Sequence, residues 1–225
     1  MNITKIASKA EKAALESYFA RVNWKAHLVP IVREAVEEFG RKLEAEGYSR
    51  PYLSLLSEAL SRGEIVLDSS NSHFGDSISI QFGVRPIATN SMAPLGKRPP
   101  ILVEERSALV FSQLSASGMV MVLIYPPSSA ASKPTQQHYL IGTYQNPSEL
   151  RKSQIIKLLR DLFEIDLCCS TQTAPSAAGA KLLVKLEARA SAIQSGSAGI
   201  FAYVKYLGYL VRGLWYLYRA SHASP

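Results

Sequence analysis

The sequence predicts an α+β protein: N-terminal helices, a mostly antiparallel sheet of four or five strands with a helix packed on it, and amphipathic or hydrophobic C-terminal helices. Three observations predict this class. Apolar residues recur at helical spacing through the first sixty residues, alternation with polar residues replaces that pattern from about residue 64, and a well-capped helix follows the last alternating segment. A sheet flanked by runs of helices is typical of the α+β class.

The N-terminal helices are the first elements along the chain. Residues 7–22, ASKAEKAALESYFARV, are rich in Ala, Glu and Lys, and residues 30–47 open on Pro30 and close on Gly47, the usual residues at helix starts and ends. A third helix is expected to begin at Pro51, to carry Leu53, Leu56 and Leu60, and to end at Gly63.

The strands are expected from residue 64 onward. Residues 64–68, EIVLD, form a short candidate strand, and residues 76–84 alternate Ile78, Ile80 and Phe82 with polar residues. Residues 85–100 hold four prolines and are expected to form an exposed loop. Residues 107–113 and 119–125 predict a hairpin whose nearly all-apolar second strand lies centrally in the sheet, and residues 137–144 predict a further strand.

The helix predicted over residues 146–165 carries the clearest start signal in the chain. Asn146 is a favourable N-cap, Pro147 occupies the first helical position, and Glu149 follows the cap by three residues, the spacing of a capping box. Its apolar positions are expected to pack on the sheet.

The domain organisation follows from composition. We expect one globular α+β domain over residues 1–175, helical over 1–62 and with the sheet and its helix over 63–170; residues 176–225 form a basic amphipathic helix, a Gly/Ser hinge and an aromatic C-terminal helix. The net charge is +7, and residues 176–225 hold six Lys and Arg against one Glu. The basic excess of this C-terminal part indicates an anionic partner there.

The aromatic segment has two distinct faces when projected as a helix. Lys205, Arg212 and Arg219 fall within about 40° of one another, with Tyr209 and Tyr216 beside them. The leucines lie opposite, and the preceding helix carries its own cations at intervals of four. The residues predicted to bind a membrane are Lys205, Arg212, Arg219, Leu207, Leu210, Leu214, Trp215, Leu217, Tyr209 and Tyr216, and those of the basic helix are Lys181, Lys185 and Arg189.

This pattern favours a non-enzymatic membrane-associating effector or regulator, by analogy of a toxin or defence type, in the cytoplasm or at the membrane surface. Lys205 and Arg212 near the middle of a span would each cost roughly 2.5–3.5 kcal/mol, so a helix lying in the interface is favoured over a lone spanning one. A pore-forming oligomer is a third geometry. The alternative function is a soluble interaction protein whose C-terminal helix forms a homodimer or complex interface; a nucleic-acid-binding protein or a hydrolase ranks third.

Candidate chemistry elsewhere in the sequence is sparse. His73 and Asp76, with Ser70 or Ser72, could be drawn as a hydrolytic site, but their closeness in one loop carries little information. Glu104 and Glu105 are expected to be a solvated strand entry rather than paired carboxylates, and Cys168 and Cys169 to be small core residues. No pattern in the sequence indicates a catalytic residue, a metal site or a cofactor.

Overall fold

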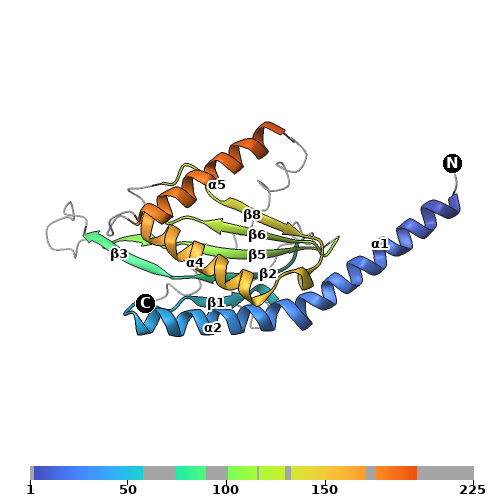
Figure 1. The fold of residues 1–225 in the computed structure, drawn as a ribbon, viewed down its shortest axis with the longest axis horizontal. Coiled ribbons are helices and arrows are strands. Elements are labelled where there is room, and N and C mark those ends of the chain that lie inside the picture. The colour runs from blue at the N-terminus through green and yellow to red at the C-terminus, as the bar shows by residue number, and fades with distance from the viewer. Residues whose placement is uncertain are drawn as a thin grey trace.

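The computed structural model describes residues 3–57, 74–89, 101–115, 117–129, 133–170 and 176–196. Over these residues the α+β class is confirmed (Figure 1). A five-stranded antiparallel sheet has the strand order β1-β2-β5-β6-β8, and a smaller sheet has the order β3-β4-β7. The larger sheet matches the predicted four or five strands, whereas the sequence did not predict the smaller one.

The N-terminal helices run into one another without a break. Helix α1 (Ile3–Asn23) continues through a π-helical turn (Trp24–Leu28) into α2 (Val29–Ala45). Pro30 lacks an N–H and cannot continue the ordinary ladder, and the wider turn, closed by the Val29 N–H on the Trp24 carbonyl, accommodates it. The predicted stop is confirmed, since Gly47 follows the helix at a φ of +82°.

The third predicted helix is wrong over residues 51–55, whereas the next two residues, Leu56 and Ser57, are helical as expected. Residues Tyr52–Leu55 form strand β1, which pairs antiparallel with β2 (Phe74–Gln81) and places Leu53 opposite Ile80 and Leu55 opposite Ile78. Pairing with β2 therefore overrides the weak helical spacing of the leucines. The strand predicted over residues 64–68 lies outside the described residues.

The predicted loop over residues 85–100 is also wrong in its first part. Strand β3 (Val84–Thr89) pairs with β4 (Ile101–Glu105), and β4 pairs in turn with the short β7 (Ser128–Ser129). Pro86 is tolerated because β3 is an edge strand of this sheet and its register shifts between Pro86 and Ala88.

The predicted hairpin is confirmed as β5 (Ala108–Leu114) and β6 (Val120–Tyr125), with β6 inside the sheet between β5 and β8 (Tyr139–Tyr144). The capping box on Asn146 and Glu149 is present, but it starts a 3₁₀ turn (Pro147–Glu149). Leu150 is extended, and helix α4 (Lys152–Cys169) starts after Arg151, whose backbone N–H donates to the Gln154 side chain at 2.8 Å. The predicted helix therefore begins as a 3₁₀ turn, and its α-helical part starts six residues after the Asn146 cap.

The main core lies between one face of the large sheet and the helices α2, α4 and α5 (Ala177–Gly196). Ile78, Ile80, Leu109, Phe111 and Val122 face this core. On the other face of the sheet Val110, Met121 and Leu123 are also almost fully buried. Both faces of the sheet are therefore apolar at its centre.

Helix α1 is anchored at the turn between β5 and β6. The Gln113 side-chain amide donates to the carbonyls of Ala20 (3.1 Å) and Gly118 (3.2 Å). Gly118 has a φ of +72°, and a Cβ added there would lie 2.5 Å from the Cβ of Ala20. Only a glycine allows the helix to come this close.

Replacing Gly118 with alanine is expected to lower the free energy of unfolding by about 2–4 kcal/mol, because backbone strain and overlap with Ala20 add. The matched control is Gly47→Ala, where φ is also positive but nothing lies within 4 Å of the added Cβ. The control should cost only about 1 kcal/mol. Urea denaturation of both variants measures the difference, and equal losses would contradict the close approach of α1.

Candidate functional site

The basic row of α5 lies on the surface of the protein. Lys181, Lys185 and Arg189, spaced by four residues, are all exposed. The opposite side of the helix packs on the core through Leu186, which is buried, and through neighbours that are partly buried. Those neighbours are Leu182, Leu183 and Ala190. The amphipathic helix predicted from the sequence is therefore present, with its cations turned outward.

Helix α5 is seated on α4 by close contact near its first turn. A Cβ added to Gly179 would lie 2.5 Å from the carbonyl oxygen of Glu164 and 2.6 Å from the Cβ of Cys168. The Ser176 hydroxyl accepts from the Gly179 N–H (2.8 Å) and donates to the Glu164 carboxylate (2.8 Å). These contacts fix which side of α5 faces solvent.

The charges around α5 leave its outer surface basic. The only acid of the helix, Glu187, is directed inward to the Tyr139 hydroxyl at 3.4 Å, where burial raises the pKa of Tyr139 far above its usual range. Arg189 donates to the Ile141 carbonyl at 2.7 Å, which holds that guanidinium at the β8 edge. Burial raises the pKa of Asp161, against nearby cations that include Lys185.

The ten residues predicted to bind a membrane all lie outside the described residues, so that prediction is neither confirmed nor contradicted. Helix α5 extends through Gly196, which makes the first half of the hinge predicted at residues 194–199 helical. Among the described helices, none is both long enough and apolar enough to cross a bilayer.

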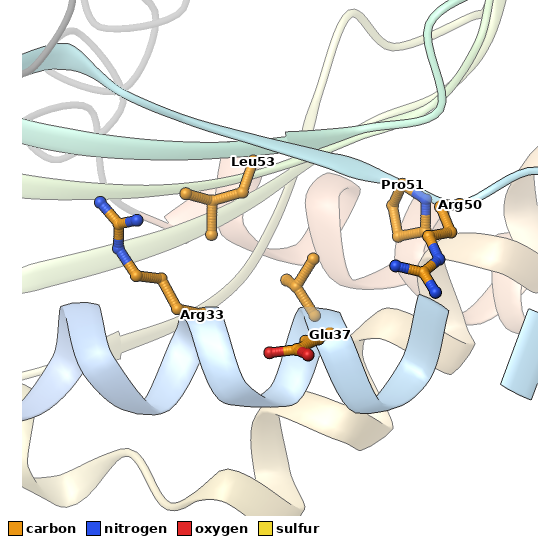
Figure 2. Close-up of a pocket in the computed structure, with 6 residues that line it drawn as sticks. Arg33, Glu37, Arg50, Pro51 and Leu53 are labelled. Carbon is orange, nitrogen blue, oxygen red and sulfur yellow. The ribbon is translucent and has the colours of Figure 1, made fainter. Parts of the chain in front are cut away.

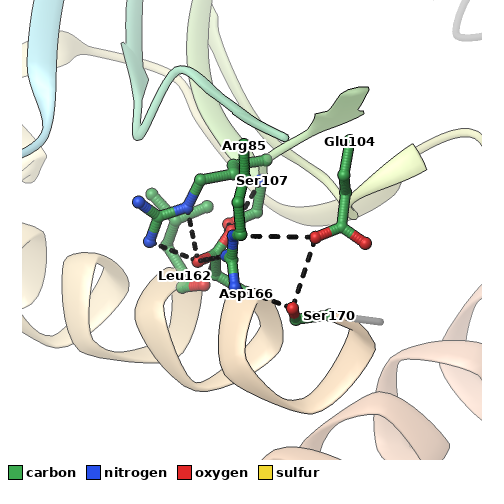
Figure 3. A network of polar contacts seen from close by, with 7 residues as sticks. Arg85, Glu104, Ser107, Leu162, Asp166 and Ser170 are labelled. Carbon is green, nitrogen blue, oxygen red and sulfur yellow. Dashed lines mark hydrogen bonds and ion pairs between the residues drawn. The ribbon is translucent and has the colours of Figure 1, made fainter. Parts of the chain in front are cut away.

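A cluster of buried charges lies where the smaller sheet meets α4 (Figure 3). The Asp166 carboxylate, fully buried, accepts from Arg106 at 2.6 and 2.9 Å and from Arg85 at 3.2 Å. It also accepts from the backbone N–H of Ser107 at 2.9 Å and from the Ser107 hydroxyl at 3.1 Å. Every polar direction of this carboxylate is thus occupied by a donor.

Glu104 completes the cluster and corrects an expectation. It was expected at a solvated strand entry, yet it is only 1% exposed, 3.8 Å from Arg85, and accepts from the Ser170 hydroxyl at 3.3 Å. Arg106 also lies over the Phe82 ring at 4.7 Å. Two guanidinium groups and two carboxylates balance in charge, and the cluster joins β3, β4 and β5 to α4. We assign it a structural role.

No pattern in the sequence indicates this cluster. Arg85, Arg106 and Asp166 are separated by up to 81 residues and belong to no spacing pattern. An arginine in a predicted loop and an aspartate inside an amphipathic helix both suggest solvated positions. The one hint in the sequence is that Asp166 occupies a position on the apolar side of α4, where an acid needs a partner inside the protein.

A pocket of about 380 Å³ lies between α2 and β1 (Figure 2). Arg33 and Glu37 line it from α2, and Arg50, Pro51 and Leu53 line it from the other side. Arg50 already pairs with Glu44 at 2.6 Å. The pocket therefore combines an apolar floor with a rim of mixed charge, which does not define a particular ligand.

The residues of the sketched hydrolytic site do not form one among the described residues. Asp76 lies within β2 and accepts from the Trp24 indole at 3.1 Å and from the Ser57 backbone N–H at 3.0 Å, so it ties the π-helical turn to the sheet. His73 and both candidate serines lie outside the described residues. The His138 ring lies tilted against the Tyr125 ring with centroids 5.6 Å apart, and burial lowers the pKa of His138 below its usual value, which favours the neutral ring.

The described residues contain no group of three or more His, Cys, Asp or Glu side chains placed to hold a metal ion. Cys168 and Cys169 end α4 as half-buried free thiols and not as the core residues expected, although Cys169 packs against the edge of the core. Comparison of the sequence with family models, with curated proteins and with solved structures found no match.

Replacing Asp166 with alanine is expected to lower the free energy of unfolding by about 3–5 kcal/mol, because two buried guanidinium groups lose their acceptor. Arg160→Ala, on the exposed side of the same helix, is the control and should change it by less than about 0.5 kcal/mol. Urea denaturation compares the two. Equal effects would show that the buried cluster contributes no more than a surface charge.

The thiol of Cys169 is expected to react slowly. Burial, with a contribution from Cys168, raises its pKa from 9.0 to about 11, so its thiolate fraction at pH 8 falls about 100-fold. A Cys168→Ser variant leaves Cys169 as the single cysteine, and its reaction with a disulfide reagent can be timed in buffer and in urea. The unfolded control should react about 10- to 100-fold faster, since burial is the largest cause of the raised pKa and the contribution of Cys168 is absent in this variant, and equal rates would contradict the raised pKa.

Proposed function

We propose that the protein is a non-enzymatic membrane-associating effector or regulator, in which α5 and the C-terminal tail, residues 197–225, bind an anionic lipid surface. The observation that carries the proposal is the exposed row of Lys181, Lys185 and Arg189 on a helix whose single acid is directed inward to Tyr139. A helix with one basic side and one apolar side is typical of segments that approach anionic headgroups.

The magnitude of the electrostatic attraction supports a surface location. Each Lys or Arg near an anionic surface contributes about 1 kcal/mol within a Debye length. The tail adds three further cations, Lys205, Arg212 and Arg219, to the three of α5. Six such charges would contribute up to about 6 kcal/mol if all of them lay within a Debye length of the lipid surface. Because the apolar side of α5 is packed on the core, the tail must supply the apolar contact with the lipid.

In the absence of a membrane, the leucine side of the tail needs another apolar cover. In this proposal it rests on the second face of the large sheet, where Val110, Met121 and Leu123 are buried. The helices α2, α4 and α5 all pack on the opposite face. From Leu207 to Leu217 a helix rises about 15 Å, enough to cross about three strands at roughly 4.8 Å each.

The second candidate is a soluble interaction protein in which the C-terminal helix forms a homodimer or complex interface. Exposed apolar residues among the described residues, above all on α1, favour a role in protein association, without identifying the C-terminal helix as the interface. Binding to lipid vesicles separates the two candidates, because a protein interface does not require anionic lipid.

The membrane proposal predicts that the full chain floats with vesicles containing phosphatidylserine and stays unbound with phosphatidylcholine alone. Replacing Lys205, Arg212 and Arg219 with glutamate should abolish flotation, and replacing Lys181, Lys185 and Arg189 should weaken it at least tenfold. Added salt should weaken binding of the unaltered chain, because it screens the headgroup attraction.

The matched control carries glutamate at Arg41, Lys157 and Arg160, which are exposed on α2 and α4. Its net charge changes by the same amount, so retained flotation would assign the effect to the C-terminal cations. Failure of the unaltered chain to float with either lipid would overturn the proposal. A deletion of residues 197–225 that only abolishes dimerisation would support the second candidate instead.

A further inference from the structure

Helix α1 carries an apolar stripe that no described element covers. Leu15, Tyr18, Phe19 and Val22 are exposed by 56%, 56%, 51% and 42%. Their spacing of i, i+3, i+4 and i+7 places them within about 100° of arc on one side of the helix. The rings of Tyr18 and Phe19 pack edge to face with centroids 5.8 Å apart. We call these four residues the α1 stripe.

The α1 stripe cannot turn inward to bury itself. The opposite side of the same helix is fixed to the body, since Ser17 and Ala20 are buried against the β5–β6 turn. Trp24, fully buried at the end of the helix, is held to Asp76. Figure 1 shows α1 extending beyond the sheet toward its N-terminus. The helix is thus anchored on one side and presents large apolar side chains to solvent on the other.

We propose that the α1 stripe is a homodimer interface, in which α1 of a second copy packs antiparallel about a two-fold axis that passes between Tyr18 and Phe19. In this register Leu15 faces Val22 of the second copy, and the aromatic residues meet at the axis. Such an interface is self-complementary, as a two-fold dimer requires. The inference does not depend on membrane binding.

The charges beside the α1 stripe argue for a second copy and for its direction. Glu11 projects within the arc of the stripe and Lys25 projects just beyond the same edge; both are exposed. In the antiparallel register Glu11 lies within one residue, about 1.5 Å, of the level of Lys25 of the second copy and on the same edge of the interface, which brings two opposite-charge pairs together. A parallel arrangement would instead place each Glu11 level with Glu11 and each Lys25 level with Lys25, with no opposite-charge pair between these residues. Lys12 already pairs with Glu16 of its own helix at 3.9 Å.

The size of the interface sets the expected affinity. Covering the exposed half of two aromatic and two aliphatic side chains from each copy removes on the order of 800 Å² of accessible surface. Stable specific interfaces remove about 1,200 Å² or more, so we expect a dimer that dissociates in the micromolar range. The experiment therefore needs a series of protein concentrations.

Sedimentation equilibrium of the full chain tests the proposal. The unaltered chain is expected to change from monomer to dimer across the micromolar range, and Tyr18→Glu with Phe19→Glu should raise the dissociation constant at least 100-fold. The matched control carries glutamate at Ile101 and Val184, which are 62% and 66% exposed on other elements. A monomeric unaltered chain overturns the proposal, as does a dimer that the α1 variant retains.

A charge exchange tests the direction of packing and does not require a change in the apolar residues. Glu11→Lys and Lys25→Glu should each weaken the dimer about tenfold, and the double variant should recover it, because the opposite-charge pairs are restored with their order reversed. Additive losses in the double variant would overturn the antiparallel register. Both positions are exposed on the surface of the fold, so circular dichroism should show an unchanged structure.

Discussion

The arrangement of the two sheets and α4 depends on the ion pairs and hydrogen bonds that the buried carboxylate of Asp166 accepts. This carboxylate binds Arg85 from β3 and Arg106 beside β5, and it also accepts from the backbone of Ser107. A buried carboxylate with fewer donors would be strongly destabilising, because its charge has lost its water. The smaller sheet, the larger sheet and the end of α4 must therefore assemble together around this group. This requirement explains why acids and arginines lie in an otherwise apolar junction.

The position of α4 determines in turn which side of α5 is exposed. Gly179 allows the backbone of α5 to approach the Glu164 carbonyl, and Ser176 caps the first turn while bonding to the Glu164 side chain. With this turn fixed, the helical period places Leu186 in the core and Lys185 in solvent. The outward basic row is thus a consequence of a close contact between two helices, and the buried network at the end of α4 holds that contact in place.

Local patterns in the sequence predicted the elements that local forces determine. The alternation of Ile78 and Ile80 and the leucines of α5 each identified their element correctly, and the capping residues at Asn146 identified a cap that starts a 3₁₀ turn just ahead of α4. The errors fall where distant pairing decides the structure: Leu53 belongs to a strand because β2 lies beside it, and Pro86 belongs to one because β4 does. The buried ion network was missed for the same reason, since its members are far apart in the chain. The candidate site was predicted only as far as the basic helix, because exposure of its cations follows from amphipathic spacing alone.

The two proposals bear on one another through valency. A monomer offers one set of C-terminal cations to a lipid surface, whereas a dimer formed through α1 offers two sets joined by a rigid helical contact. Once one set is bound, the second binds at a high local concentration, so the apparent affinity rises without any new contact with lipid. Because the dimer is expected to be weak, this gain depends on protein concentration, and accumulation on a membrane would itself promote pairing of α1. Membrane binding and self-association would then reinforce each other, as thermodynamic linkage requires of two coupled equilibria.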